Sequence, residues 1–337
     1  MASPITHVII ITKENHTFDN YFGAFPGAKG EVLPHAKDPH PDQGHGHGAW
    51  LKNKGAGGVT GTAKTQYQAS DFPAYWAFAQ QYTLCDNYFT DVATQSEPNH
   101  LFLIAANSPV IDNTSHGRNY QPQPPFDIPS LPQALADAKH TWRNYAEANS
   151  SYFQHIKALQ GNPWNVASSQ FDTDVAKGFL PDVSWLYAPF GDSEHPGSQT
   201  VHQGAQWTAQ RVLQVAKSPL WASTAIIITW DDWGGWYDHV AAPEQSKWTG
   251  TGPAGYQGSQ FRYGPRVPCL VVSPYAKQEV NHHFYSHASV VKFCIRLFGL
   301  TAWNAPALAK GDPSGDLFEA FDFAAQPRLG IPSIIPT

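Results

Sequence analysis

The chain has 337 residues, of which 42 % are hydrophobic and only 14 % are charged, and its formal net charge is −6. This length suffices for one large domain or two ordinary ones, with enough apolar residues for a sizeable core. The acidic balance argues against a nucleic-acid binder, which needs a basic face, and no apolar run approaches the roughly 18 residues that span a bilayer.

The N-terminal residues and the composition bear on the cellular compartment. MASPITHVIII, residues 1–11, has neither the basic start nor the cleavage site of a signal peptide. A low charge content with many Gly, Pro, Gln, Asn and Ser residues is more typical of secreted proteins. We expect a secreted or periplasmic protein in its mature form, to which a new initiator Met has been added. The alternative is a cytoplasmic protein. Cys85, Cys269 and Cys294 are widely spaced, which predicts buried thiols with at most one disulfide.

Five segments are predicted to form strands and two longer ones to form helices. The strands are expected at 8–12, 140–146, 181–188, 223–230 and 267–276. Apolar residues at helical spacing predict helices over 198–218 and 286–299, the second with Ser286 as N-cap and Gly299 as its stop. Strands that alternate with helices predict an α/β fold with a largely parallel sheet. We expect a single domain over 1–337, in which 24–66 forms a long ordered loop.

Acidic and amide residues follow two of the predicted strands directly. ENHTFDNYFG, residues 14–23, comes after the first strand, and Asp231 and Asp232 come after 223–230. In open α/β sheets ligands collect outside the carboxyl ends of the strands. If the two strands are parallel neighbours, Glu14, Asn15 and the Asp pair converge. Carboxylates at such short distances repel one another unless a cation lies among them. Oxygen ligands suit a hard or borderline divalent ion. The alternative for the Asp pair is a turn or a helix cap.

Ser96 is the candidate nucleophile. It lies in TQSEPNHLFLIA, residues 94–105, where a short polar segment runs into an apolar helix. A serine hydroxyl needs a base or a metal to become nucleophilic at neutral pH. The alternative is that Ser96 caps the helix.

Several of the 16 histidines lie in contexts typical of active sites. A cluster of them would supply positive charge for a phosphate and a proton for a leaving group. Each alone could equally be a structural residue. The candidates are His45, His195 and His239, together with His282, His283 and His287 before a helix start. The segment GGVTGTAKT, residues 57–65, lacks the adjacent Gly-Lys of a P-loop and is expected to be a surface loop.

Seven motifs in this order give the chain a family resemblance: ENHTFDNYFG, CDNYF, SEPNH, DSEHP, TWDDWGGWYDHV, GPRVPCLVVSPYA and YSHASVVKF. They resemble the phosphoesterase family of bacterial non-specific phospholipases C and a related acid phosphatase, with plant relatives. The resemblance spans about residue 5 to about residue 300. SEPNH is also similar to the sulfatase pattern, but His100 stands where sulfatases have Arg, so a sulfatase is a more distant alternative.

The resemblance implies an alkaline-phosphatase-like fold, a three-layer αβα sandwich around a mostly parallel sheet. It implies one divalent metal ion, with Ca, Zn, Fe and Mg all open as its identity. His195 is expected near the phosphate, with His45 or His47 as a second catalytic histidine and Asp42, His239 and His287 at the substrate. The implied metal ligands are Glu14, Asn15, Ser96, Asp231 and Asp232.

The resulting functional hypothesis is a metal-dependent phosphoesterase that attacks a phospholipid on the diacylglycerol side through a phosphoseryl intermediate. One alternative is a broad acid phosphatase that acts on phosphomonoesters. Another is a catalytically weak protein that binds lipid headgroups through aromatic residues. The expected partner is a phospholipid or another phosphate ester, with transient contact at a membrane surface and no nucleic acid.

Overall fold

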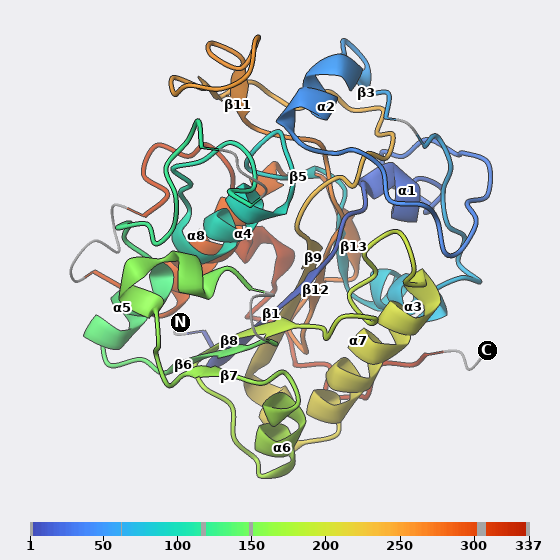
Figure 1. Ribbon diagram of the computed structural model, residues 1–337. Coiled ribbons are helices and arrows are strands. Elements are labelled where there is room, and N and C mark those ends of the chain that lie inside the picture. Colours follow the sequence, from blue (N-terminus) through green and yellow to red (C-terminus); the bar gives the residue numbers. More distant parts are fainter. Residues whose placement is uncertain (1–2, 62, 116–118, 148–150, 302–307, 335–337) are drawn as a thin grey trace.

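The computed structural model describes residues 3–61, 63–115, 119–147, 151–301 and 308–334, and an eight-stranded sheet runs through its centre (Figure 1). Only β12 runs antiparallel to its neighbours in this sheet; every other neighbouring pair is parallel. In order across the sheet the strands are β13 (Glu279–Asn281), β4 (Thr83–Cys85), β12 (Cys269–Val272), β9 (Thr224–Trp230), β1 (His7–Lys13), β8 (Val183–Tyr187), β6 (Trp142–Tyr145) and β7 (Asn165–Val166). The prediction of a largely parallel sheet is confirmed.

The strands β1 and β9 lie side by side in the middle of the sheet. Both are buried along nearly their whole length, and both contain an uninterrupted run of isoleucines. Strands covered by helices on both faces have such continuous apolar runs because neither face meets water. This central pair carries the acidic residues of the candidate site at its carboxyl ends.

Helices cover both faces of the sheet (Figure 1). On one side lie α4 (Ser96–Ala105), α5 (Leu131–Asp137) and α8 (His287–Leu297), and on the other α3 (Pro73–Gln81), α6 (Gln170–Ala176) and α7 (Val201–Ala216). The predicted helices correspond to α7 and α8, and Ser286 caps α8 as expected, in a reciprocal capping box with Ser289. The predicted three-layer αβα sandwich is therefore confirmed.

The expectation of a continuous loop over 24–66 is wrong in part. Helix α2 (His47–Asn53) and a small hairpin of β2 (Lys54–Gly55) and β3 (Gly58–Val59) lie within it. The helix forms because Asp112 accepts a hydrogen bond from the backbone N–H of His47 and because Trp50 packs in a small cluster with Trp233. Both partners are distant in sequence. Within the segment compared with a P-loop, residue 62 lies outside the described residues.

The remaining elements are short. Helix α1 (Phe18–Phe22) starts at Thr17, whose hydroxyl accepts from Asn20 N. Two-stranded sheets pair β10 (Ser246–Lys247) with β11 (Gln260–Arg262), and β5 (Tyr88–Phe89) with β14 (Tyr285–Ser286). The three cysteines are buried and free, as predicted, and Cys85 lies opposite Cys269 on β4 and β12.

A buried cluster of ion pairs ties the segment after residue 308 to α8. Arg262 contacts both Asp91 and Asp312, and Lys292 Nζ of α8 lies 3.1 Å from Asp312 Oδ1. Burial alone would raise the pKa of Asp312, but Arg262, the Ser314 hydroxyl and Lys292 lower it to about 2. The carboxylate thus stays ionised in the folded protein at pH values where it is protonated in the unfolded chain.

This lowered pKa predicts a pH dependence of stability. The contribution of Asp312 is complete above its unfolded pKa of about 4 and is lost as the pH falls toward about 2. We expect the difference in unfolding free energy between the wild type and Asp312→Asn to shrink by up to about 2 kcal/mol over that range. Urea unfolding of both proteins at several pH values measures it. A difference that is constant with pH would contradict the prediction.

Candidate active site and metal centre

The acidic residues of the candidate site meet because β1 and β9 are parallel and in register. Lys13 lies opposite Trp230, so Glu14 and Asp231 leave the sheet at the same level. The Asn15 N–H donates to Asp231 Oδ1 at 3.1 Å, and the Asp232 N–H donates to the same oxygen at 2.7 Å. The predicted convergence of the two strand ends is confirmed by this register.

Two residues with positive φ let the strand ends turn without a conventional turn sequence. Asn15 has φ 63°, a left-handed conformation that asparagine tolerates better than most residues. Gly234 has φ 58°, and a Cβ there would lie 2.2 Å from the Asn15 carbonyl oxygen. Glycine is therefore required at 234, and its N–H donates to Asp232 Oδ1 at 2.8 Å. The close approach of the two loops fixes the orientation of the Asp232 carboxylate.

Ser96 reaches this acidic group from the first residue of α4. Its Oγ donates to Asp232 Oδ2 at 3.1 Å, and its side chain is almost entirely buried. The N-cap position belongs to Gln95, so the alternative that Ser96 caps the helix is wrong. The start of a helix also favours an anion such as a phosphate through its N–H groups and dipole.

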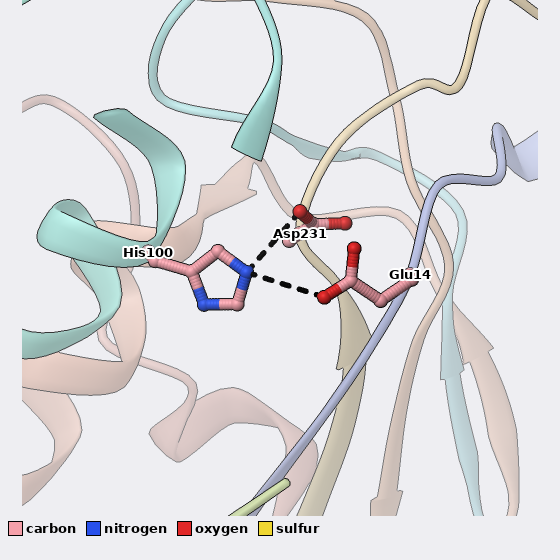
Figure 2. Close-up of side chains that lie close together, drawn as sticks. All are labelled: Glu14, His100 and Asp231. Carbon is pink, nitrogen blue, oxygen red and sulfur yellow. Dashed lines mark ion pairs between the residues drawn. The ribbon is translucent and has the colours of Figure 1, made fainter. Parts of the chain in front are cut away.

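His100 lies in the middle of the group, and sequence reasoning did not assign it to the site. Its Nε2 is 3.2 Å from Asp231 Oδ2 and 3.8 Å from Glu14 Oε1 (Figure 2). Burial lowers the pKa of His100, but the two carboxylates raise it to about 9. The signal that could have found it is its spacing of four residues from Ser96, which places both side chains on one face of a helix.

The electrostatics of the Asp pair fit a cation. Both side chains are fully buried, and burial followed by the charge of Asp231 raises the pKa of Asp232 well above its usual value. Burial also opposes ionisation of Asp231, but His100 lowers its pKa. Two adjacent buried carboxylates ionise together only when positive charge is near. The oxygen donors of Glu14 and Asn15 complete a set that suits a divalent ion.

Of the two early-loop histidines, the structure brings His45 to the acidic residues. Its Nε2 lies 3.9 Å from Asp232 Oδ2 and 3.4 Å from Asn15 Nδ2, and Asp42 Oδ1 lies 3.6 Å from its Nδ1. His47 is buried elsewhere, with its ring nitrogens bonded to the Ala93 carbonyl and the Ser259 hydroxyl. Its two nitrogens are thus engaged in holding α2 in place.

His195 borders an open pocket next to Glu14. Its ring centroid is 6.3 Å from that of His45, so the two histidines flank the acidic group. Burial lowers the pKa of His195, but Glu14, the Pro196 carbonyl, Asp42 and Asp231 outweigh burial and raise it. Aromatic side chains form part of the same pocket wall, those of Tyr152, Tyr187 and the exposed Phe190.

The other two histidines that were expected to bind substrate, His239 and His287, do not line the pocket that His195 borders. His239 Nδ1 is 2.6 Å from Asp19 Oδ2, in a cluster with Asp238 and the buried Arg266. The Arg266 guanidinium pairs with both carboxylates, so this second acidic cluster already contains a buried cation. His287 is fully buried beneath the site, where Nε2 contacts the Asp231 carbonyl at 2.8 Å and Nδ1 contacts the Tyr88 hydroxyl at 3.1 Å.

A buried glutamate connects the three segments that carry the site. Glu194 directly precedes His195, and its carboxylate is fully enclosed. Lys13, which precedes Glu14, lies 3.1 Å from Oε1, and Trp230, which precedes Asp231, donates to Oε2 at 3.0 Å. Two further donors are the hydroxyls of Tyr21 and Tyr75, at 2.7 and 2.5 Å. No short motif predicted this hub, since its four partners come from four separate elements, β1, β9, α1 and α3.

None of the described helices is long and apolar enough to cross a membrane.

Comparisons with known proteins extend these observations. The non-hemolytic phospholipase C of Pseudomonas aeruginosa is 28 % identical over 95 % of this chain and 57 % of that relative. Phospholipase C A of Mycobacterium tuberculosis is 26 % identical over 98 % of this chain and 79 % of its own length. The chain thus spans less than two thirds of the first of these relatives. The crystal structure of Ps i-CgsB in complex with k-i-k-neocarrahexaose matches 94 % of this chain and 76 % of that one, with TM-score 0.51 and 11 % identity, a likeness of fold alone.

A family model matches residues 35–301, which is more than half of the chain. The matched region includes Ser96, His100, His195 and the Asp pair, that is, most of the candidate site. On this match, the chain belongs to the Phosphoesterase family.

Proposed function

We propose that the chain is a metal-dependent phosphoesterase of phospholipase C type, which cleaves a phospholipid between phosphorus and the diacylglycerol oxygen. The observation that carries the proposal is the Ser96 hydroxyl, held 3.1 Å from Asp232 Oδ2 at the start of a helix and inside a buried acidic group. The names of the most similar relatives support the substrate class.

The ion would be held by the oxygen donors that meet at the strand ends, Glu14, Asn15, Ser96, Asp231 and Asp232. When bound, it supplies Lewis acidity that lowers the pKa of the Ser96 hydroxyl and neutralises charge on the phosphoryl oxygens.

The first chemical step transfers the phosphoryl group to Ser96. The Oγ forms a bond to phosphorus while the bond from phosphorus to the diacylglycerol oxygen breaks. Asp232 Oδ2 accepts the Ser96 proton, and protonated His195 gives a proton to the departing oxygen. The products of this step are diacylglycerol and a phosphoserine that carries the headgroup.

The second step reverses these roles. A water molecule attacks phosphorus and gives its proton to His195, and the Oγ–P bond breaks. Asp232 returns the proton to Ser96 Oγ, and the headgroup phosphate leaves. The raised pKa of His195 favours the protonated imidazole that the first step requires.

The test compares two substrates side by side. We expect the metal-replete protein to release diacylglycerol from phosphatidylcholine vesicles, and to lose this activity on exhaustive chelation and regain it when a divalent ion is added. Hydrolysis of p-nitrophenyl phosphate alone would instead identify a phosphomonoesterase. Binding of vesicles without hydrolysis of either substrate would identify a headgroup-binding protein. Activity that survives chelation would show that hydrolysis does not require the ion.

The role of His195 predicts a dependence on the leaving group. A lipid alkoxide needs a proton to depart, whereas p-nitrophenolate leaves without one. We expect His195→Ala to lower turnover of the phospholipid by about 10²-fold or more and that of p-nitrophenyl phosphate much less. The measurement is kcat on both substrates for the variant and the wild type.

A matched control for this prediction is His140→Ala. His140 is partly buried and pairs with Asp182 at 3.1 Å. The pair lies just before the amino ends of β6 and β8, whereas the candidate site lies at the carboxyl ends of the strands. It should leave both rates unchanged. Equal losses on the two substrates in His195→Ala would mean that His195 binds phosphate and is not the acid.

A further inference from the structure

His100 lies on helix α4 and its side chain faces the carboxyl ends of β1 and β9. It lies four residues after Ser96 in α4, about one helical turn, so the two side chains leave the same face of the helix. The ring is fully buried and packs against Tyr152 and Tyr187, with centroid distances of 4.9 and 5.5 Å. These contacts hold the imidazole in one orientation.

Among the described residues Nδ1 of His100 has no hydrogen-bond partner, and Nε2 faces Asp231 Oδ2 at 3.2 Å and Glu14 Oε1 at 3.8 Å as ion pairs without hydrogen-bond geometry. Buried imidazoles normally have such partners, so this side chain calls for an explanation. Its Nε2 is directed toward the space between Asp231 Oδ2 and Glu14 Oε1 (Figure 2). The three ligand atoms lie within 4.8 Å of one another. Donors that share one ion at about 2.0–2.2 Å are separated by about 3–4 Å, which fits the observed spacing.

We propose that His100 is a nitrogen ligand of the divalent ion, bound through Nε2 next to Glu14 and Asp231. The inference rests on the proposed function for the presence of an ion, and it adds a donor of different chemistry to the oxygen set. Imidazole nitrogen favours ions such as Zn²⁺, Fe²⁺ and Co²⁺, whereas Ca²⁺ and Mg²⁺ prefer oxygen. The resident ion is therefore a transition metal or zinc.

The test measures metal binding and does not depend on hydrolysis. Chelated wild type and His100→Gln are titrated calorimetrically with Co²⁺ and with Ca²⁺. We expect the variant to bind Co²⁺ at least about tenfold more weakly, and Ca²⁺ with less than about threefold change. Pulsed EPR of the Mn²⁺-loaded wild type should show coupling to a ¹⁴N nucleus, and this coupling should be absent from the variant.

His155→Gln is the control. His155 is partly exposed and pairs with Glu97, which follows Ser96 in α4, at 2.7 Å. It should keep both the ¹⁴N coupling and the preference for Co²⁺. If His100→Gln does not fold, His100→Asn replaces it in both measurements.

Three results would overturn the assignment. They are the absence of ¹⁴N coupling in the wild type, its persistence in the His100 variants, and equal losses of Co²⁺ and Ca²⁺ affinity. Each would make His100 a charge partner of the two carboxylates. A nitrogen-bound ion in a protein that hydrolyses no ester would refute the proposed function and leave this inference intact.

Discussion

Ser96→Ala is expected to lower turnover of the phospholipid by at least about 10³-fold, since removal of a nucleophile abolishes the covalent route and leaves only the contribution of binding and electrostatics. The fold should persist, because the lost hydroxyl donates a single hydrogen bond, to Asp232, and lies at the start of a helix. The measurement is kcat on phosphatidylcholine together with the unfolding free energy of the same preparation.

Ser130→Ala is the matched control for this variant. Ser130 is a buried serine at the N-cap of α5, where its hydroxyl donates to Gln133. Loss of this hydrogen bond should cost about 1 kcal/mol of stability and leave kcat unchanged. If Ser96→Ala retained a near-normal rate, a water molecule and not the serine would be the attacking group.

Glu194→Gln is expected to lower the unfolding free energy by about 3–5 kcal/mol, because it leaves the buried ammonium of Lys13 without its counter-charge. All four side-chain partners donate to Glu194, so the amide NH₂ of glutamine finds an acceptor only if a tyrosine hydroxyl gives up its own hydrogen bond to this position. Burial raises the pKa of Glu194, while Lys13 and the two tyrosine hydroxyls oppose this rise.

The same substitution should impair catalysis in the fraction that stays folded. Glu194 joins the residues next to Glu14, His195 and Asp231, and a displacement of about 1 Å in an active site can cost about 10²-fold in rate. We expect a fall of this size in kcat at a temperature where circular dichroism shows the variant to be folded. An unchanged kcat would mean that Glu194 stabilises the fold without positioning the site.

Glu244→Gln provides the contrast for the stability measurement. Glu244 and Lys247 form an exposed pair at 3.7 Å. Water screens such pairs, so this variant should lose less than about 1 kcal/mol. A double-mutant cycle of Glu194→Gln with Lys13→Met then separates the coupling of the buried pair from the loss of the other hydrogen bonds.

Much of the α/β fold could be predicted from the local sequence. The isoleucine runs of β1 and β9 predict strands covered on both faces, and Ser286 predicts the start of α8, because these features act over a few neighbouring residues. The pairing of the two strand ends also followed, since parallel strands of an open sheet bring their carboxyl ends to one place. The motif resemblance indicated the family before any geometry was known.

The choice between similar side chains depended on the tertiary structure. His45 and His47 are two residues apart, yet His45 faces Asp232 whereas the ring of His47 turns to Ala93 and Ser259, because a helix that Asp112 and Trp233 stabilise begins at His47. His287 lies beneath Asp231 although its helix start suggested an anion site. Sequence spacing does not encode such orientations.

By itself, the sequence determined the αβα frame, the meeting of Glu14 with the Asp pair and the family, because strand periodicity and motif order are local properties of the chain. Ser96 was expected in that acidic group from the family resemblance, but only the tertiary structure decided that His100 enters it from the same helix and that Glu194 joins the segments which carry it. The physical reason is that these contacts link residues more than 30 positions apart, and their geometry is set by how the helix layers pack on the sheet.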